Sequence, residues 1–213
     1  GIVHRLDGDT SGLMLCAKND EVGYILQDEI RRRNVDRKYL CLVHGNIASD
    51  TGLIDAPIFR SDKNRTRMQV SDKPQARSSV TTFNVLERFE SGLKDNGFTL
   101  VECKLYSGRT HQIRVHMEYI NHWVVGDQTY GNPGKSSNLG LCRQFLHSYF
   151  IEFQHPCIND TLSFMAPLPD DLIQAISQLA DRRIGLTERG HEVLAAYQEN
   201  CGITEERESF ALV

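Results

Sequence analysis

Apolar and polar positions change their spacing several times along the chain, and each spacing predicts a different element. Between residues 20 and 33 the apolar side chains Val22, Ile25, Leu26 and Ile30 recur with the period of an amphipathic helix. A turn with a helix cap at 107–110 predicts a second helix that runs to about residue 119. Two more helices are expected over 170–179 and 187–197.

Strand patterns lie between these helices. Residues 12–17 form a short apolar run, and residues 38–43 are rich in strand-forming side chains. The runs 76–89 and 98–105 alternate, and the turn-like segment 91–97 between them predicts an antiparallel hairpin. Residues 145–153 and 161–165 are expected to pair across the turn at Asn159 and Asp160.

Sequential strands joined by short turns favour an α+β fold with a mixed, mostly antiparallel central sheet and flanking helices. The sequence lacks the regular βαβ alternation that a doubly wound fold needs. It also lacks a G-x-G-x-x-G motif and a P-loop, so no nucleotide cofactor is implied.

Composition narrows the class of protein further. A length of 213 residues fits one domain, and the net charge of -4 does not by itself indicate a polyanion partner. Basic residues nevertheless cluster at 31–33, 37–38 and 63–77, so the chain can present a basic face. No run approaches the ~18 apolar residues of a membrane span, and no signal peptide is visible.

The six cysteines carry no C-x-x-C pair. Several lie in apolar, strand-like runs, where a free thiol behaves as a small hydrophobic group. We expect reduced core cysteines in a cytoplasmic protein, and no metal site.

The first candidate for chemistry is Asp7, two residues after Arg5 and close to an apolar run. A carboxylate in such a place either takes part in catalysis or caps backbone amides in a turn completed by Thr10 and Ser11. Arg5 either pairs with Asp7, points towards a phosphate, or lies on the surface.

Two further segments concentrate charge and aromatic rings. Arg114 lies near the apolar side of its predicted helix, so it needs an anionic partner, for which Asp7 is a candidate. His111 and His116 are five positions apart, which does not match a helical metal pair. Tyr39 follows two cations on a strand and is either a base-stacking ring beside phosphate-binding charge or an ordinary sheet tyrosine.

Together these segments resemble the RluA-type family of RNA pseudouridine synthases. The resemblance covers residues 1 to about 180, and shorter matching stretches lie at 126–131, 143–147, 155–156 and 166–170. The three main motifs are His4-Arg5-Leu6-Asp7-Gly8-Asp9-Thr10-Ser11-Gly12-Leu13, Arg37-Lys38-Tyr39-Leu40-Cys41-Leu42-Val43-His44-Gly45 and Gly108-Arg109-Thr110-His111-Gln112-Ile113-Arg114-Val115-His116.

This resemblance implies the pseudouridine synthase fold and isomerisation of uridine to pseudouridine in RNA, with no cofactor or metal. It implies that Asp7 is the catalytic carboxylate, that Tyr39 stacks on the target base and helps to remove its C5 proton, and that Arg114 pairs with Asp7. Large-subunit ribosomal RNA is the expected substrate, with transfer RNA as the alternative. The residues expected to bind RNA are Arg5, Arg37, Lys38, Arg109 and His111.

Two other classes of function are weighed against this one. A catalytically impaired RNA-binding fragment is disfavoured because Asp7, Tyr39 and Arg114 are all present. A hydrolase built on Ser11 is disfavoured because no G-x-S-x-G motif surrounds that serine.

The resemblance also predicts a domain organisation. Residues 1–180 are expected to form a catalytic domain that lacks its N-terminal part, and an S4-type RNA-binding domain is expected to be missing as well. Residues 181–213 are expected to form a helical C-terminal extension without an assigned role. The oligomeric state is left open.

Overall fold

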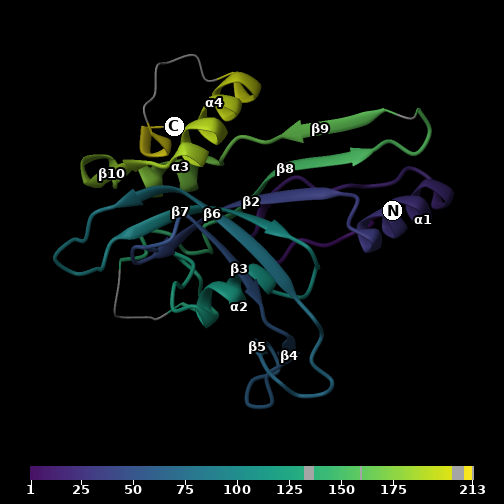
Figure 1. The fold of residues 1–213 in the computed structure, drawn as a ribbon, viewed down its shortest axis with the longest axis horizontal. Helices are drawn as coiled ribbons and strands as arrows, with labels where there is room; N and C mark the ends of the chain where they lie inside the picture. Colours follow the sequence, from purple (N-terminus) through teal and green to yellow (C-terminus); the bar gives the residue numbers. More distant parts are fainter. Residues whose placement is uncertain (132–136, 159, 203–208, 213) are drawn as a thin grey trace.

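The computed structural model describes residues 1–131, 137–158, 160–202 and 209–212. In this part of the chain, a sheet of eight strands lies between helices on its two faces (Figure 1). The strand order is β1-β8-β2-β7-β6-β10; β3 also pairs with β6, and β9 with β8. Of these pairs β1–β8 is parallel and the others are antiparallel, so the predicted mixed, mostly antiparallel sheet is confirmed. The strands are β1 (Ser11–Gly12), β2 (Asp36–His44), β3 (Thr51–Asp55), β6 (Val80–Phe89), β7 (Phe98–Leu105), β8 (Leu146–Gln154), β9 (Thr161–Met165) and β10 (Arg183–Leu186).

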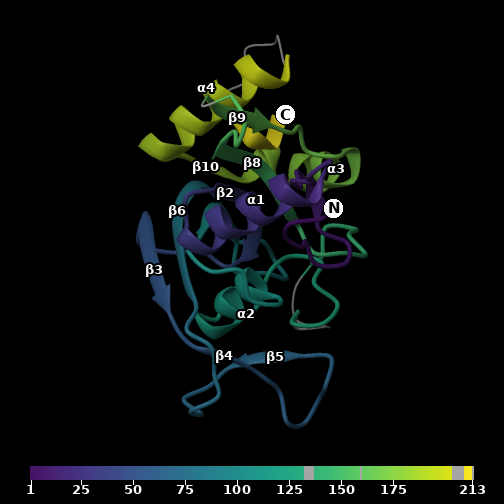
Figure 2. The same ribbon diagram turned by 90° about the vertical axis from the view of Figure 1, so that its right-hand side faces the viewer.

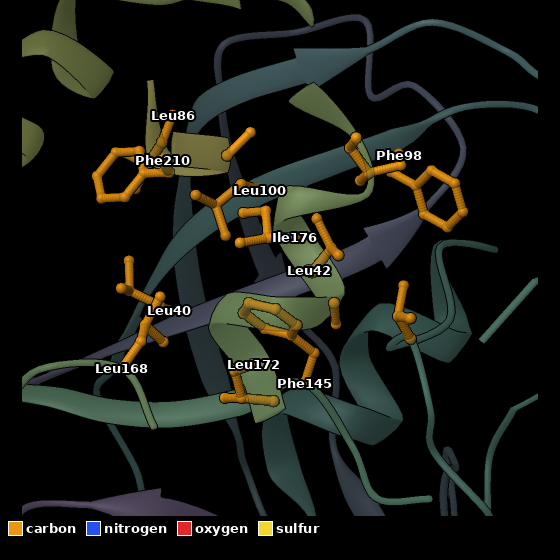
Figure 3. Packing of buried hydrophobic residues seen from close by; sticks show 14 of the residues in the cluster. Leu40, Leu42, Leu86, Phe98, Leu100, Phe145, Leu168, Leu172, Ile176 and Phe210 are labelled. Carbon is orange, nitrogen blue, oxygen red and sulfur yellow. The ribbon is translucent and has the colours of Figure 1, made fainter. Parts of the chain in front are cut away.

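One face of the sheet packs against the C-terminal helices α3 (Asp170–Ser177) and α4 (Glu188–Cys201). Because successive side chains of a strand point to opposite faces, Leu40 and Leu42 of β2 lie on this side. Figure 3 shows them packed with Leu172 and Ile176 of α3. This is the largest of the hydrophobic clusters, and Phe210 also belongs to it.

The other face carries α2 (Gln112–Tyr119), which lies on the side of the sheet away from α3 and α4 (Figure 2). Tyr39 and Cys41 of β2 pack here against Ile113 and Met117 of α2. Helix α1 (Asp20–Arg32) packs its buried Leu26 in a separate cluster with residues of β8. Next to α2, β4 (Ile58–Arg60) and β5 (Met68–Val70) form a two-stranded hairpin outside the main sheet.

Most predicted elements are present, although several of their boundaries differ. The strand expected over 12–17 ends at Gly12, whose φ of 108° turns the chain out of the extended conformation. The strand expected from residue 76 begins at Val80, since the backbone of Arg77 pairs with Ile58 instead. The cap of α2 is His111, which makes no side-chain capping bond, rather than a residue of the turn at 107–110.

Residues 181–202 and 209–212 pack on the same sheet as the preceding chain. Strand β10 pairs with β6, and α4 rests on β6. Arg189 of α4 donates two hydrogen bonds, of 3.0 and 2.9 Å, to the buried carboxylate of Glu102 on β7. A charge pair of this kind fixes the position of the helix over the sheet.

The expectation that the cysteines are core residues is wrong for half of them. All six are free, but Cys16, Cys142 and Cys157 are exposed, and Cys41 and Cys103 are buried. The buried pair lies on β2 and β7, whereas the exposed ones lie outside regular strands, where an apolar neighbourhood in sequence does not ensure burial. Among the described residues, no helix has the length and apolar character needed to cross a membrane.

Candidate active site

The segment that carries Asp7 is a tight turn fastened to β8 and to the loop before it. The amide of Thr10 donates to the carbonyl of Asp7 over 3.2 Å, which closes the turn. Gln144 donates from its side chain to the carbonyl of Gly8 over 2.7 Å and to the hydroxyl of Thr10 over 3.0 Å. These hydrogen bonds hold the turn in one position, which is what a catalytic side chain needs from the segment that carries it.

Gly12 permits this close approach. A Cβ at residue 12 would collide with the backbone of Ser148 on β8, and the backbone of Gly12 has a φ of 108°, which side-chain-bearing residues rarely adopt. The amide of Leu13 then donates to the carbonyl of Ser148 over 2.8 Å. The first motif thus has a glycine at the position where its backbone contacts the backbone of β8.

The start of α2 approaches Asp7 from the other side. His111 caps the helix in a left-handed conformation, with φ of 57°, and its amide lies 3.4 Å from a carboxylate oxygen of Asp7. Arg114, one turn further along α2, places Nη1 3.5 Å from Oδ2 of Asp7. The side chain of Asp7 is only 13% exposed and that of Arg114 only 6%, so solvent screens this attraction weakly.

Asp127 is the closer partner of Arg114. Its carboxylate accepts from Nε at 2.6 Å and from Nη2 at 2.8 Å, in a bidentate arrangement that fixes the guanidinium plane. It also accepts from the amides of Thr129 and Tyr130 at 2.8 and 3.0 Å. Burial alone would raise the pKa of Asp127, but the hydrogen bonds from Arg114 hold that pKa below its usual value.

The third wall of the site comes from β2. Tyr39 is 4% exposed, and burial raises the pKa of its hydroxyl although the charge of Arg37 opposes the shift. Tyrosine is already a neutral phenol at neutral pH, and this shift keeps the hydroxyl of Tyr39 protonated to a higher pH. Arg37 is 5% exposed, and its Nε has no hydrogen-bond partner among the described residues. A buried guanidinium of this kind is poised for an anion.

A cavity of about 440 Å³ joins these elements. Asp7 and Tyr39 both line it, together with Arg37. The loop 107–109 also lines it, and Gln112 holds this loop by accepting from the hydroxyl of Ser107 at 2.8 Å and from the amide of Arg109 at 3.0 Å. The cavity is thus a polar, cationic recess with one carboxylate, Asp7, and two tyrosine rings, Tyr39 and Tyr106.

The structure brings most of the sequence-predicted site residues to this cavity. Arg5, Arg37 and Arg109 line it with Asp7 and Tyr39. Arg114 lies behind Asp7, and the imidazole of His111 is turned to the hydroxyl of Tyr130 at 2.8 Å.

Lys38 lies apart from the others. It neighbours Tyr39 in sequence, but strand alternation carries its side chain to the opposite face, where the ammonium sits 4.7 Å from the centre of the Phe150 ring. Its contact with RNA remains a prediction.

Asp127 is the functional residue that sequence reasoning did not identify. The sequence showed that Arg114 needs an anion, and the stretch 126–131 was among those that resemble the family. The aspartate in that stretch was the one indication of the missing anion. Hydrophobic periodicity could not have linked it to Arg114, because it lies in a turn and Arg114 lies on α2. Among the described residues, no cluster of histidine, cysteine or carboxylate side chains could hold a metal ion.

Comparison with known proteins gives a consistent picture. The family model described as RNA pseudouridylate synthase matches residues 1–119. An RNA pseudouridine synthase of Bacillus subtilis, itself named as uncharacterised, is 46% identical over 179 residues, which are 84% of this chain and 55% of that protein. Ribosomal large subunit pseudouridine synthase D of Nitrosomonas europaea is 42% identical over 187 residues, covering 84% of this chain and 52% of that protein.

Solved structures show the same likeness. The human protein named RNA pseudouridylate synthase domain containing 1 superposes with a TM-score of 0.74 at 25% identity, covering 92% of this chain and 79% of that one. The chain spans about half the length of the curated relatives it matches.

Proposed function

The chain belongs to the RNA pseudouridylate synthase family, and from this premise we propose that it converts uridine to pseudouridine in RNA, with Asp7 as the catalytic carboxylate. The observation that carries the proposal is the placement of Asp7 on the wall of a cationic cavity, 3.5 Å from the buried Arg114 and beside Tyr39. A carboxylate, a cation that holds it and an aromatic ring are the groups that the proposed reaction scheme uses.

The reaction breaks the bond between N1 of the base and C1′ of the ribose and forms a bond between C5 and C1′. A proton leaves C5, and N1 gains one, so the RNA keeps its composition. A uridine within a helix does not expose its glycosidic bond, so it must be turned out into the cavity at a cost of a few kcal/mol. The cavity of about 440 Å³ has the scale of a small-molecule site.

Each side chain has a role in this scheme. The carboxylate of Asp7 acts covalently or stabilises positive charge on the ribose. Arg114 holds that carboxylate in place and is itself held by Asp127. The neutral ring of Tyr39 stacks on the turned base, and its hydroxyl takes part in removing the C5 proton.

The proposed substrate is large-subunit ribosomal RNA. The support is that several of the relatives are named ribosomal large subunit pseudouridine synthase D. Mapping pseudouridines in total RNA from cells with and without the gene tests this choice. Loss of a site in transfer RNA, with ribosomal RNA unchanged, would contradict it.

Asp7→Asn tests the activity. The amide keeps the shape of the side chain but removes the charge, so turnover should fall by at least roughly 10³-fold while RNA affinity changes little. Release of tritium from C5-labelled uridine in the RNA measures turnover, and filter binding measures affinity.

Asp9→Asn is the matched control, because Asp9 is an exposed carboxylate on the same turn and does not line the cavity. Asparagine tolerates its left-handed backbone, with φ of 68°. Near-normal turnover in Asp7→Asn would contradict the assignment of Asp7 as the catalytic carboxylate. A wild-type chain that binds RNA without isomerising it would favour the RNA-binding reading.

A further inference from the structure

The charges that line the cavity do not balance. Asp7 is the one carboxylate among the lining residues, all of which lie in the described part of the chain. An excess of guanidinium groups around one carboxylate calls for a ligand with several negative charges. The arginines that line the cavity are Arg5, Arg31, Arg33, Arg37 and Arg109.

Two of these arginines come from an element that the family motifs do not include. Arg31 and Arg33 lie at the carboxyl end of α1 and line the same cavity as Asp7, whereas Arg32 between them does not line it. We propose that Arg31 and Arg33 form a second RNA-backbone site, which binds phosphate of the strand next to the uridine that enters the cavity. This inference rests on the proposed function and adds a binding surface to it.

The backbone of Arg33 supports a functional choice at this position. Arg33 ends α1 in a left-handed conformation, with φ of 69°, and its amide donates to the carbonyls of Glu29 and Ile30. Glycine is the residue that usually occupies such a helix end, because it adopts positive φ without steric cost. An arginine there carries a backbone cost that glycine would avoid.

The side chain of Arg33 is also available to a ligand. The residue is exposed, and within the described ranges its guanidinium forms no ion pair. Arg37, whose buried Nε has no hydrogen-bond partner in those ranges, lines the same cavity. A phosphate that enters the cavity can therefore contact the buried guanidinium of Arg37 and the exposed guanidinium of Arg33 without displacing another anion from either.

Arg31 is bound only weakly by its neighbours. Its Nη1 lies 2.8 Å from Asp28, but the side chain is 75% exposed, and surface pairs of this kind exchange readily with a better anion. Arg32 pairs with the same carboxylate through Nε at 2.6 Å. Asp28 can therefore keep one arginine while the other contacts RNA.

The competing explanation is that basic residues simply complement the dipole at the end of a helix. That explanation treats all three arginines alike, since each lies within the last turn or at its cap. The proposal separates them, because Arg31 and Arg33 face the cavity and Arg32 does not. Arg32 is therefore a control of the same residue type in the same turn.

The test measures how RNA affinity depends on salt. Each phosphate contact to single-stranded RNA contributes about 0.7 to the slope of log affinity against log salt. The double variant R31A/R33A should therefore reduce the slope by about 1.4, which corresponds to roughly 25-fold weaker binding at 0.1 M salt relative to the wild type. The probe is a fluorescent uridine-containing single-stranded RNA of about 20 nucleotides, and R32A should leave slope and affinity close to wild type.

Arg33→Gly guards against a purely structural effect. Glycine suits the left-handed helix end, so this variant should unfold at a higher temperature than the wild type and yet bind RNA about fivefold more weakly at 0.1 M salt. Unchanged salt slopes in Arg33→Gly and R31A/R33A would overturn the inference. Equal losses in R32A and R31A/R33A would overturn it as well, in favour of a general charge effect.

Failure of the proposed function gives a different result. A wild-type chain that neither binds nor isomerises RNA contradicts the function itself. A wild-type chain that isomerises uridine, with R31A/R33A indistinguishable from it in salt slope, contradicts only the second RNA-backbone site.

Discussion

Single residues acquire their roles here from groups that lie far away in the sequence. A buried position for Arg114 was predictable from its place near the apolar side of a helix. Its contact with Asp7 was expected from the resemblance of the two motifs to the family. Asp127 was not predictable in the same way, since its contact with Arg114 is made across a turn and leaves no period in the sequence. Burial of Tyr39 follows from its place on β2, and the raised pKa of its hydroxyl follows from that burial.

Tyr39→Phe separates stacking from proton removal. The ring remains, so the Michaelis constant for RNA should change little, but loss of the hydroxyl should lower the maximal rate by about 10²-fold. Tyr106→Phe is the control, because Tyr106 lines the same cavity and its ring contacts Lys104 rather than Asp7 or Arg114. Steady-state kinetics by tritium release decide the matter, and a normal rate in Tyr39→Phe would exclude a role of the hydroxyl in proton removal.

Elements with strong periodicity were predicted, whereas several short elements without it were not. Helix α1 and the β6–β7 hairpin appear where the pattern of apolar residues placed them. Strands β3, β4, β5 and β10 have three to five residues each and are only partly buried, so they carry too few apolar positions for a period of two to emerge. Their pairing with β6, or with each other, is decided by tertiary contacts.

Two glycines within helices should respond in opposite directions to alanine. Gly190 lets α4 lie against β6, and a Cβ there would collide with the carbonyl oxygen of Leu86, so Gly190→Ala should destabilise the fold by about 1–3 kcal/mol. A Cβ at Gly23 of α1 meets only the Cβ of Ala17, at 3.6 Å, so Gly23→Ala should stabilise the fold by up to about 1 kcal/mol. Urea unfolding measures both, and the same sign for the two variants would show that the contact between α4 and β6 is more yielding than the structure indicates.

The molecule as a whole should lose stability in mild acid. Burial lowers the pKa of five histidines, to about 4 for His4 and His44, whereas an unfolded chain binds those protons near pH 6.5. The unfolded state then binds more protons than the folded state, so the free energy of unfolding falls as the pH drops from about 6.5 to 4. Below about pH 4, protonation of Asp127, whose pKa is lowered, continues the loss. Glu87 acts in the opposite direction at higher pH, above the 4.5 at which an unfolded glutamate takes up its proton, because burial raises its pKa in the folded protein.

Urea unfolding at a series of pH values between 7.5 and 4.5 checks this dependence. His44→Gln should flatten the fall, since it removes one buried imidazole, whereas His191→Gln, at an exposed position, is the control. A free energy of unfolding that stays constant from pH 6.5 to 4.5 would contradict the expected role of the buried histidines.

Strand β2 has a consequence for how the protein folds. The side chains at its odd positions, Arg37 and Tyr39, line the cavity. Those at its even positions, Leu40 and Leu42, belong to the hydrophobic core that packs against α3 and α4. A register slip of one residue would exchange the two sets and lose both at once. The cavity and the core should therefore form in one cooperative step. A substitution that destabilises either one should destabilise the other, and the cavity should not open locally while the core stays folded.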